Sequence, residues 1–342
     1  MKSTTTIGIA TIVALGLICG TAFAQLPQPS PTGIRARRFR RSMPPFYQGA
    51  VPSHTSKEAG LALDSPALTL TSGIYTFPGS VGSYVAGSNK AGHIVGGYGP
   101  GVSAPYTGAI HGFLLKGDKF TSFDYPGAVA TIPYGINDSG EIVGEWEDSS
   151  GYGHSFQLKG GAFTTIDPPG SNSSVAAGIN KAGDIVGTWS ADDFDYTCHG
   201  YLLSKGGYTT IDYPGDVCTY INGINNAGEM AGWYYFTSTT GNGFVYSGSS
   251  FTTLNYPGGY TYNGVLDIND DGLVMGGYGT NGYPYVFQHC YLYQSGTFTT
   301  CDPPFGPPAQ TISSHLNDSG IVVGQYLDNS GTSYGYEVTV GP

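Results

Sequence analysis

Arginine is absent from most of this chain, and charge of either sign is scarce. The five arginines all lie within positions 35–41, and charged residues make up only 11% of the 342 residues. From residue 67 onward six lysines stand against 22 acidic residues, a formal charge of −16. Nucleic-acid binding needs clustered basic side chains, so this composition argues against nucleic acid as a partner. An arginine clamp for an acidic substrate is excluded on the same ground.

Long hydrophobic runs are also missing, apart from one near the N-terminus. A lysine precedes the apolar run Ile7–Ile18, and a small-x-small sequence ends at Ala24. This order is typical of a secretory signal peptide, which we assign to residues 1–24. A lipoprotein signal at Cys19 is disfavoured by the large isoleucine before it, and the run is short for an uncleaved anchor. We therefore predict a secreted or cell-surface protein, extracellular or periplasmic.

Residues 25–66 are rich in proline and poor in large apolar residues. We interpret them as a flexible linker, and the basic cluster Arg35–Arg41 as part of a solvated, disordered arm. Anchoring to an anionic surface, or proteolytic processing, are the alternative roles for this cluster.

The remaining residues, 67–342, repeat one pattern six times. Each copy holds an Asn three residues before a Gly, and successive copies lie 48, 43, 45, 44 and 48 residues apart. A period in this range is typical of stacked or radially arranged units. The anchors are Asn89/Gly92, Asn137/Gly140, Asn180/Gly183, Asn225/Gly228, Asn269/Gly272 and Asn317/Gly320.

Each copy divides into four short extended runs. In the second copy these are Thr131–Asn137, Glu141–Glu147, His154–Lys159 and Ala162–Asp167. Their β-branched and aromatic residues, bounded by Gly, Pro, Asn and Asp, indicate strands joined by hairpin turns. The Asn-x-x-Gly stretch suits such a turn because Gly accepts a positive φ and the Asn side chain bonds nearby backbone.

The fold prediction follows from the aromatic residues that recur in these strands. One four-stranded sheet cannot cover them, whereas packing between like sheets buries them, which favours a closed ring. The last copy lacks a fourth strand, and Ile74–Gly79 resembles the missing one. We predict an all-β, six-bladed β-propeller of four-stranded antiparallel blades, closed by an N-terminal strand that completes the C-terminal blade, and a monomer. A seven-bladed ring would need a further contribution from Ala67–Thr71.

Four cysteines remain after signal-peptide cleavage, and secretion permits disulfides. A turn at Ser295-Gly296 places Cys290 opposite Cys301, so we predict a bridge between them. Cys198 and Cys218 flank the corresponding hairpin of another copy, and we predict that they join across its open end.

Two acidic stretches are candidate sites. The densest is the loop Asp192, Asp193, Asp195 and Tyr196, which is a candidate binding site for a ligand or a hard cation, or else a solvated loop. The second matches the opening of a calcium loop, which makes Ca²⁺ the one cofactor to consider. Its candidate ligands are Asp267, Asn269 and Asp271.

Two observations weaken this calcium hypothesis. Tyr278 stands at the twelfth position, where a carboxylate is expected, and the same residues also form the ordinary repeat turn.

Histidine begins the third strand of four copies. Histidines on successive blades would lie too far apart for one metal ion, so a repeated structural hydrogen bond is the favoured role. They are His111, His154, His199 and His289.

The repeat itself has a known relative. The second copy, G-I-N-D-S-G-E-I-V-G-E-W followed by H-S-F-Q-L-K-G-G-A-F-T-T-I-D, resembles the HAF-type probable extracellular repeat. The H-x-F element of that family appears as His111-Gly112-Phe113 and His154-Ser155-Phe156, and the resemblance spans about Gly73–Val338. It implies secretion and a propeller, but it brings no assigned activity and no catalytic residues.

The sequence leaves the function open between three hypotheses. The first is a secreted, non-catalytic binding or scaffold propeller that recognises an extracellular glycan or protein through Tyr- and Ser-rich loops. The alternative is a carbohydrate-active enzyme, a glycoside hydrolase or lyase, with acids at the central channel. A purely structural role is the third. The acids outside the repeat pattern are Glu145, Glu147, Asp148, Asp216 and Glu229.

Overall fold

The described part of the protein consists of β-strands and their connections, without an α-helix. A computed structural model describes residues 72–100, 109–191, 197–237, 240–280, 289–302, 310–327 and 333–339. No helix in these segments has the length and apolar character needed to cross a membrane. The predicted signal peptide and linker lie outside the described residues.

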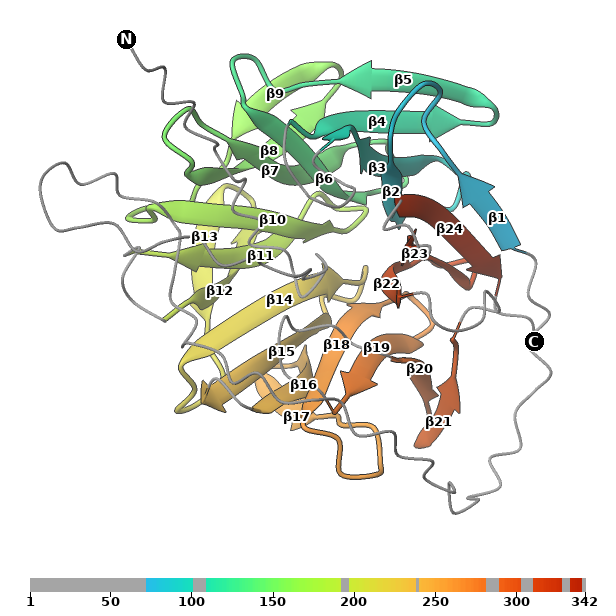
Figure 1. Cartoon of the computed structure of the whole chain (residues 1–342). Helices are drawn as coiled ribbons and strands as arrows, with labels where there is room; N and C mark the ends of the chain where they lie inside the picture. Colours follow the sequence, from blue (N-terminus) through green and yellow to red (C-terminus); the bar gives the residue numbers. More distant parts are fainter. Residues whose placement is uncertain are drawn as a thin grey trace, which may run out of the picture.

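The strands form a β-propeller arrangement of antiparallel sheets set around a common centre (Figure 1). Three sheets each take four consecutive strands. The first holds β2 (Ser83–Ser88), β3 (Ile94–Tyr98), β4 (His111–Lys116) and β5 (Lys119–Phe123). The second holds β6 (Ala130–Ile136), β7 (Ile142–Glu147), β8 (Gly153–Lys159) and β9 (Ala162–Thr165). The third holds β10 (Ser173–Ile179), β11 (Ile185–Ser190), β12 (His199–Ser204) and β13 (Gly207–Ile211).

The next two repeats share one eight-stranded sheet. A single parallel bridge, Gly241 to Tyr262, joins its two halves. For these two repeats the structure therefore shows one eight-stranded sheet in place of two separate four-stranded sheets. One half holds β14 (Cys218–Ile224), β15 (Met230–Thr237), β16 (Thr240–Ser247) and β17 (Ser250–Thr253). The other holds β18 (Tyr262–Ile268), β19 (Val274–Gly279), β20 (His289–Gln294) and β21 (Thr297–Thr300).

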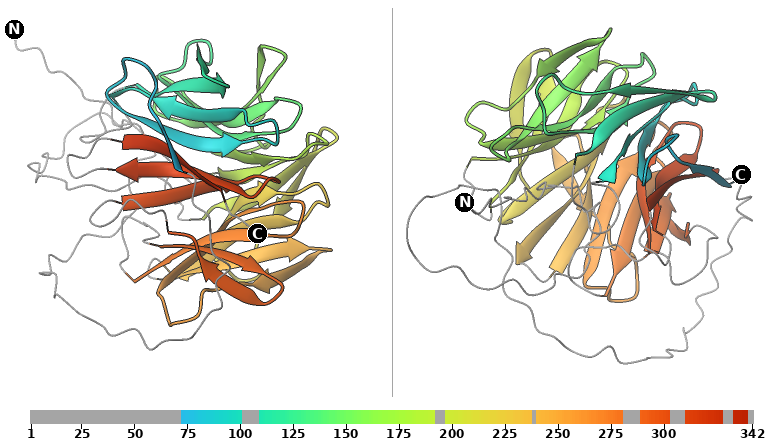
Figure 2. Two further views of the ribbon diagram at one scale, coloured as in Figure 1. Left: turned by 90° about the vertical axis from the view of Figure 1, so that its right-hand side faces the viewer. Right: turned by 45° about the horizontal axis from the view of Figure 1, so that its top comes forward.

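The last sheet joins the two ends of the described chain. It holds β22 (Gln310–Leu316), β23 (Ile321–Leu327), β24 (Ser333–Thr339) and the N-terminal strand β1 (Ser72–Tyr75). Strand β1 pairs with β24, with Ile74 opposite Tyr336 (Figure 2, blue beside red). The predicted closure by an N-terminal strand is confirmed.

The Asn-x-x-Gly turns complete the ring. In the second repeat the Asn137 Oδ1 accepts the N–H groups of Ser139 and Glu141, both at 3.0 Å, and Gly140 has a φ of 80°. The same side chain donates through Nδ2 to the carbonyl of the next anchor, Asn180, at 3.1 Å. Each of the six anchors donates to the next one in this way, and Asn317 donates back to Asn89 at 3.3 Å.

The inner strand of each repeat carries a β-bulge at the same place, three residues before its anchor Asn. A bulge re-aims the extra residue, and here that residue faces the central channel. These residues differ between repeats and leave about 10 Å³ of space, roughly that of one water. They are Ala86, Tyr134, Ala177, Asn222, Leu266 and Ser314.

Candidate functional site

The ring has two unlike faces. Because neighbouring strands are antiparallel, the Asn-x-x-Gly turns and the tight third-to-fourth strand turns lie at one end of the sheets. The connections between second and third strands, and from each repeat to the next, lie at the other end. We call this second end the loop face.

Histidine and aspartate pair on the loop face in four repeats. Each His donates through Nδ1–H to the carboxylate of the Asp that ends the fourth strand of its own repeat, 13 residues on. The expected structural hydrogen bond is thus confirmed for the predicted histidines. The pairs are His111–Asp124 at 3.0 Å, and His154–Asp167, His199–Asp212 and His289–Asp302, each at 2.8 Å.

The fourth repeat shows why these residues go together. Where histidine is replaced by Asn242, the aspartate is replaced by Asn255, and the two amides bond at 2.8 Å. Because both residues are replaced together, a hydrogen bond between the same two positions is kept. The pair therefore ties the third strand to the end of the fourth.

Aromatic rings cover these pairs from the neighbouring repeat. Tyr125, which follows Asp124, stacks on Trp146 of the next sheet at 4.3 Å and 2° between planes. The other face of Trp146 lies against His154, at 4.5 Å. Phe77 takes the same place on Tyr98, at 3.7 Å and 7°. The stacks bury the boundary between repeats, which we call a seam.

A hollow opens on the loop face at the seam between β4 and β6. Its volume is about 230 Å³, and its lining includes Ile110, His111, Asp124, Pro126 and Val129. The side chain of Asp124 is 48% exposed, whereas that of its counterpart Asp167 is 27% exposed. Repetition therefore does not make the seams identical.

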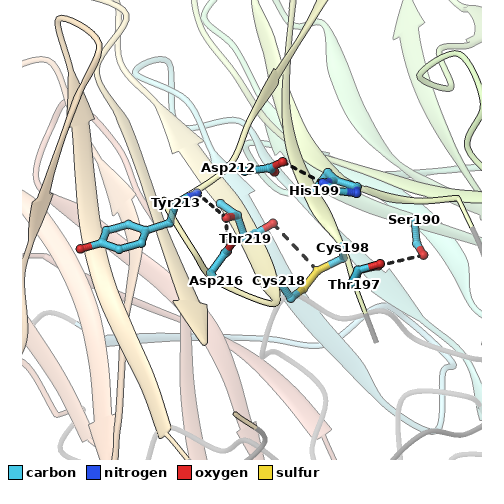
Figure 3. The surroundings of a disulfide bond; sticks show 9 residues. All are labelled: Ser190, Thr197, Cys198, His199, Asp212, Tyr213, Asp216, Cys218 and Thr219. Carbon is cyan, nitrogen blue, oxygen red and sulfur yellow. Dashed lines mark hydrogen bonds and ion pairs between the residues drawn. A yellow bond between two sulfur atoms is a disulfide. The ribbon is translucent and has the colours of Figure 1, made fainter. Parts of the chain in front are cut away.

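A disulfide occupies the equivalent place in the seam between β12 and β14 (Figure 3). Cys198 precedes His199 as Ile110 precedes His111, and Cys218 begins β14 as Ala130 begins β6. Their Cα atoms lie 4.4 Å apart. The predicted pairing is confirmed, but it links two sheets and does not close one hairpin.

The second predicted disulfide, Cys290–Cys301, is also confirmed. It joins the third strand to the residue that follows the fourth within one repeat, with the Cα atoms 5.0 Å apart.

Two buried acids, Glu145 and Glu147, lie in β7. Glu145 is 1% exposed and accepts a hydrogen bond from the Tyr134 hydroxyl at 3.4 Å. Burial, followed by the neighbouring charge of Glu147, raises the pKa of Glu145 well above its usual value. Burial and the nearby Asp148 also raise the pKa of Glu147. Both groups therefore favour the protonated form more than an exposed glutamate does.

A largely buried ion pair joins the inner strands β18 and β22 of adjacent repeats. The Asp267 carboxylate lies 2.5 Å from His315 Nδ1 and accepts the N–H groups of Ile268 and Leu316, each at 2.8 Å. The Nε2 of His315 lies 3.0 Å from the carbonyl of Ser88. Since both ring nitrogens face acceptors, this arrangement favours the imidazolium. Burial opposes the charge, yet the Asp267 carboxylate leaves the pKa of His315 raised.

The predicted calcium ligands are engaged in other contacts. Asp267 pairs with His315, and the Asn269 Oδ1 accepts the N–H groups of Asp271 and Leu273 in the repeat turn. No group of three or more His, Cys, Asp or Glu positioned for a metal occurs among the described residues. The calcium site stays a prediction.

The predicted binding residues Asp192, Asp193, Asp195 and Tyr196 lie outside the described residues. The residues that flank them are placed on the loop face, where Ser190 Oγ donates to the Thr197 carbonyl at 3.1 Å (Figure 3).

Sequence reasoning missed the aspartates of the His–Asp pairs and the hollow beside one of them. The constant spacing of 13 residues, and the joint change to Asn242 and Asn255, were signals for the first. The hollow had no comparable signal.

No family model and no curated protein matches the chain. Among solved structures, a lectin from Aleuria aurantia in complex with Fucα1-6GlcNAc is 11% identical over 76% of this chain and 94% of that chain, with a TM-score of 0.47. A mutant of AofleA from Arthrobotrys oligospora is 13% identical over 78% and 86%, with a TM-score of 0.47. A gluconolactonase from Xanthomonas campestris is 9% identical over 77% and 89%, with a TM-score of 0.46. At these scores the similarities assign neither a ligand nor an activity to this chain.

Proposed function

We propose that this chain is a secreted, non-catalytic binding propeller that recognises an extracellular glycan or protein through its loop face. The observation that carries the proposal is the contrast between the two faces. The opposite end is built from near-identical tight turns, whereas the loop face carries the variable connections and the hollow. Val81 and Val129, the exposed large apolar side chains among the described residues, are 62% and 48% exposed there.

The finer architecture and the compartment belong to the same proposal. We count the two halves of the eight-stranded sheet as two blades, so that the ring has six, in keeping with the closed circle of six asparagines. Two disulfides are compatible with an oxidising compartment. Secretion and membership of the HAF-type repeat family complete the proposal.

The binding function is tested with the full chain, expressed with its own N-terminus. Secretion predicts that the purified product begins at Gln25, which N-terminal sequencing determines. Binding predicts saturable retention on a glycan array or on immobilised cell-envelope polysaccharide, or capture of a specific extracellular protein. A product that retains Met1, or one that binds none of these materials above background, would contradict the corresponding half of the proposal.

A carbohydrate-active enzyme is the second candidate. Glu145 and Glu147 favour it, since two neighbouring acids with raised pKa values are a common arrangement for acid–base chemistry. The burial of Glu145 and its contact with Tyr134 favour a structural role instead. Release of reducing ends or unsaturated sugars by the wild-type protein, abolished by both Glu145→Gln and Glu147→Gln, would establish the enzyme.

A further inference from the structure

The seams of the ring are filled on the loop face in different ways. At three seams the last residue before His111, His199 or Asn242 lies beside the start of the next inner strand. Between β12 and β14 this place holds the disulfide Cys198–Cys218. Between β16 and β18 it holds the backbone bridge from Gly241 to Tyr262. The seam between β4 and β6 has Ile110 and Ala130 in place of the two cysteines; the Thr131 N–H donates to the Ile110 carbonyl at 2.8 Å, and the hollow opens beside this bond.

The seam between β8 and β10 shows a third solution. There the Asp167 Oδ1 accepts the Ser155 N–H at 2.8 Å and the Ser174 hydroxyl at 2.7 Å, while its Oδ2 pairs with His154. Both oxygens of Asp167 are thus used by the protein. This seam is closed by hydrogen bonds.

Asp124 is placed differently. Its two oxygens lie 3.1 and 3.0 Å from the same atom, Nδ1 of His111, so they share one partner. The Thr131 hydroxyl, at the position of Ser174, bonds to the N–H of Tyr125. A carboxylate offers about four acceptor positions, so Asp124 keeps accepting capacity on the side of the hollow.

The rest of the hollow is apolar or backbone. Ile110 and Ala130 are buried behind it, and Val129 is 48% exposed at its edge. Ligand pockets for larger molecules typically enclose about 300–1,000 Å³, so about 230 Å³ suits one ring-sized unit. The exposed Asp124 carboxylate beside His111 can accept hydrogen bonds from hydroxyl groups, and Val129 offers an apolar surface. Together they suit a ligand that has hydroxyl donors and one apolar face.

We propose that the hollow at the β4–β6 seam binds one neutral sugar residue of a glycan, which donates two neighbouring hydroxyls to Asp124 and packs its C–H face on Val129. The proposal rests on the proposed binding function and names its site. An anionic sugar is excluded by the carboxylate, since no arginine is present after position 41 to offset it. A divalent cation would require several more oxygen ligands than this site offers.

The experiment compares matched variants of the full chain. Asp124→Asn removes the charge of the acceptor, and Val129→Trp fills the hollow. Asp212→Asn and Val217→Trp make the same changes at the equivalent positions of the seam between β12 and β14, where the Cys198–Cys218 disulfide occupies the corresponding place. Affinity for a panel of neutral mono- and oligosaccharides is measured by calorimetry, and saturation-transfer NMR identifies the sugar protons in contact with the protein.

We expect Asp124→Asn and Val129→Trp each to weaken binding at least about tenfold, since a hydrogen bond to a charged group is lost or the site is blocked. The two control variants should change affinity less than about twofold. Circular dichroism and melting temperature separate loss of the site from loss of the fold.

Three results would overturn the site. They are equal binding by all four variants, equal loss in the control variants, and binding of primary amines in place of neutral sugars. In each of these the wild type still binds a ligand, so the binding function would stand. A wild-type protein that binds nothing would instead remove the function on which the site rests.

Discussion

At the residue scale, the buried carboxyl of Glu145 is an unusual component of a sheet interior. It lies in β7 opposite Ile132 and Ser155, and its side chain occupies space above Gly153, where an added Cβ would come within 1.9 Å of its Oε1. A larger residue than glycine at position 153 is therefore incompatible with Glu145 in this position. The absence of a side chain at Gly153 leaves room for the Glu145 carboxyl group.

This burial predicts how stability depends on pH. A raised pKa in the folded state means that folding takes up a proton, so the free energy of unfolding falls as pH rises above the ordinary glutamate value of about 4.3. Glu145→Gln removes this dependence, so the stability of the wild type relative to the variant should decrease steadily from pH 4 to pH 9. Urea denaturation from pH 4 to pH 9 measures it. Parallel curves for the two proteins would contradict the assignment.

His154 predicts a pH dependence of stability in the same direction as Glu145, but at higher pH. Its hydrogen bond to Asp167, with the charges of Asp167 and Asp148, raises its pKa although burial lowers it. The charged pair stabilises the fold fully below the unfolded pKa of about 6.5, and this contribution is lost as pH rises through the higher folded value. Relative to His154→Gln, the wild type should lose on the order of 1 kcal/mol above that pH.

NMR titration of the His154 imidazole provides the direct check. A midpoint at or below that of an exposed histidine would refute the prediction. The titration curve of the same histidine in Asp167→Asn should move to lower pH.

At the element scale, the His–Asp pair acts as a tie between the third and fourth strands. The Asn242–Asn255 pair shows that a second combination serves in the same place. We expect His199→Asn and Asp212→Asn each to destabilise the protein by about 1 kcal/mol, and the double variant to be less destabilised than the sum. A double-mutant cycle by chemical denaturation gives the coupling energy. Strict additivity would mean that the two side chains act independently.

Much of the secondary structure could be predicted from the sequence. Strand order, hairpin turns and both disulfide pairings follow from the repeat, because turn residues and strand residues recur at constant offsets. The eight-stranded sheet could not be predicted from the sequence, because it depends on one backbone bridge between Gly241 and Tyr262. A bridge of the same kind joins Cys198 and Cys218 in another seam. The hollow at Asp124 does not follow either, because it arises where neighbouring side chains fail to fill a seam.

At the scale of the whole molecule, β1 holds the ring closed. The ring of Phe77 stacks on Tyr98 of the first sheet and meets Phe120 edge-on at 5.4 Å. The Tyr75 hydroxyl donates to Glu337 of the last sheet at 2.9 Å, and burial with this carboxylate raises the pKa of Tyr75 to about 12. Residues close together in the sequence therefore contact both sheets of the closing seam.

Phe77→Ala should consequently loosen this seam first. We expect a loss of about 2–3 kcal/mol, below the range for a fully buried Phe because Phe77 is partly exposed. Amide hydrogen exchange should accelerate in β24 and β2 more than in β10 and β11. Val81→Ala, at an exposed position nearby, serves as the control and should change stability by less than about 0.5 kcal/mol. Uniform acceleration in every sheet would contradict a local role for the seam.

The circle of asparagine amides described above has no first member. The side chain of every anchor donates a hydrogen bond to its successor, and its backbone carbonyl accepts one from its predecessor. The bond from Asn317 to Asn89 is of the same kind as the others. The contacts among the six turns therefore do not depend on which repeat comes first in the chain. A circularly permuted chain that begins in another repeat should therefore form the same six hydrogen bonds.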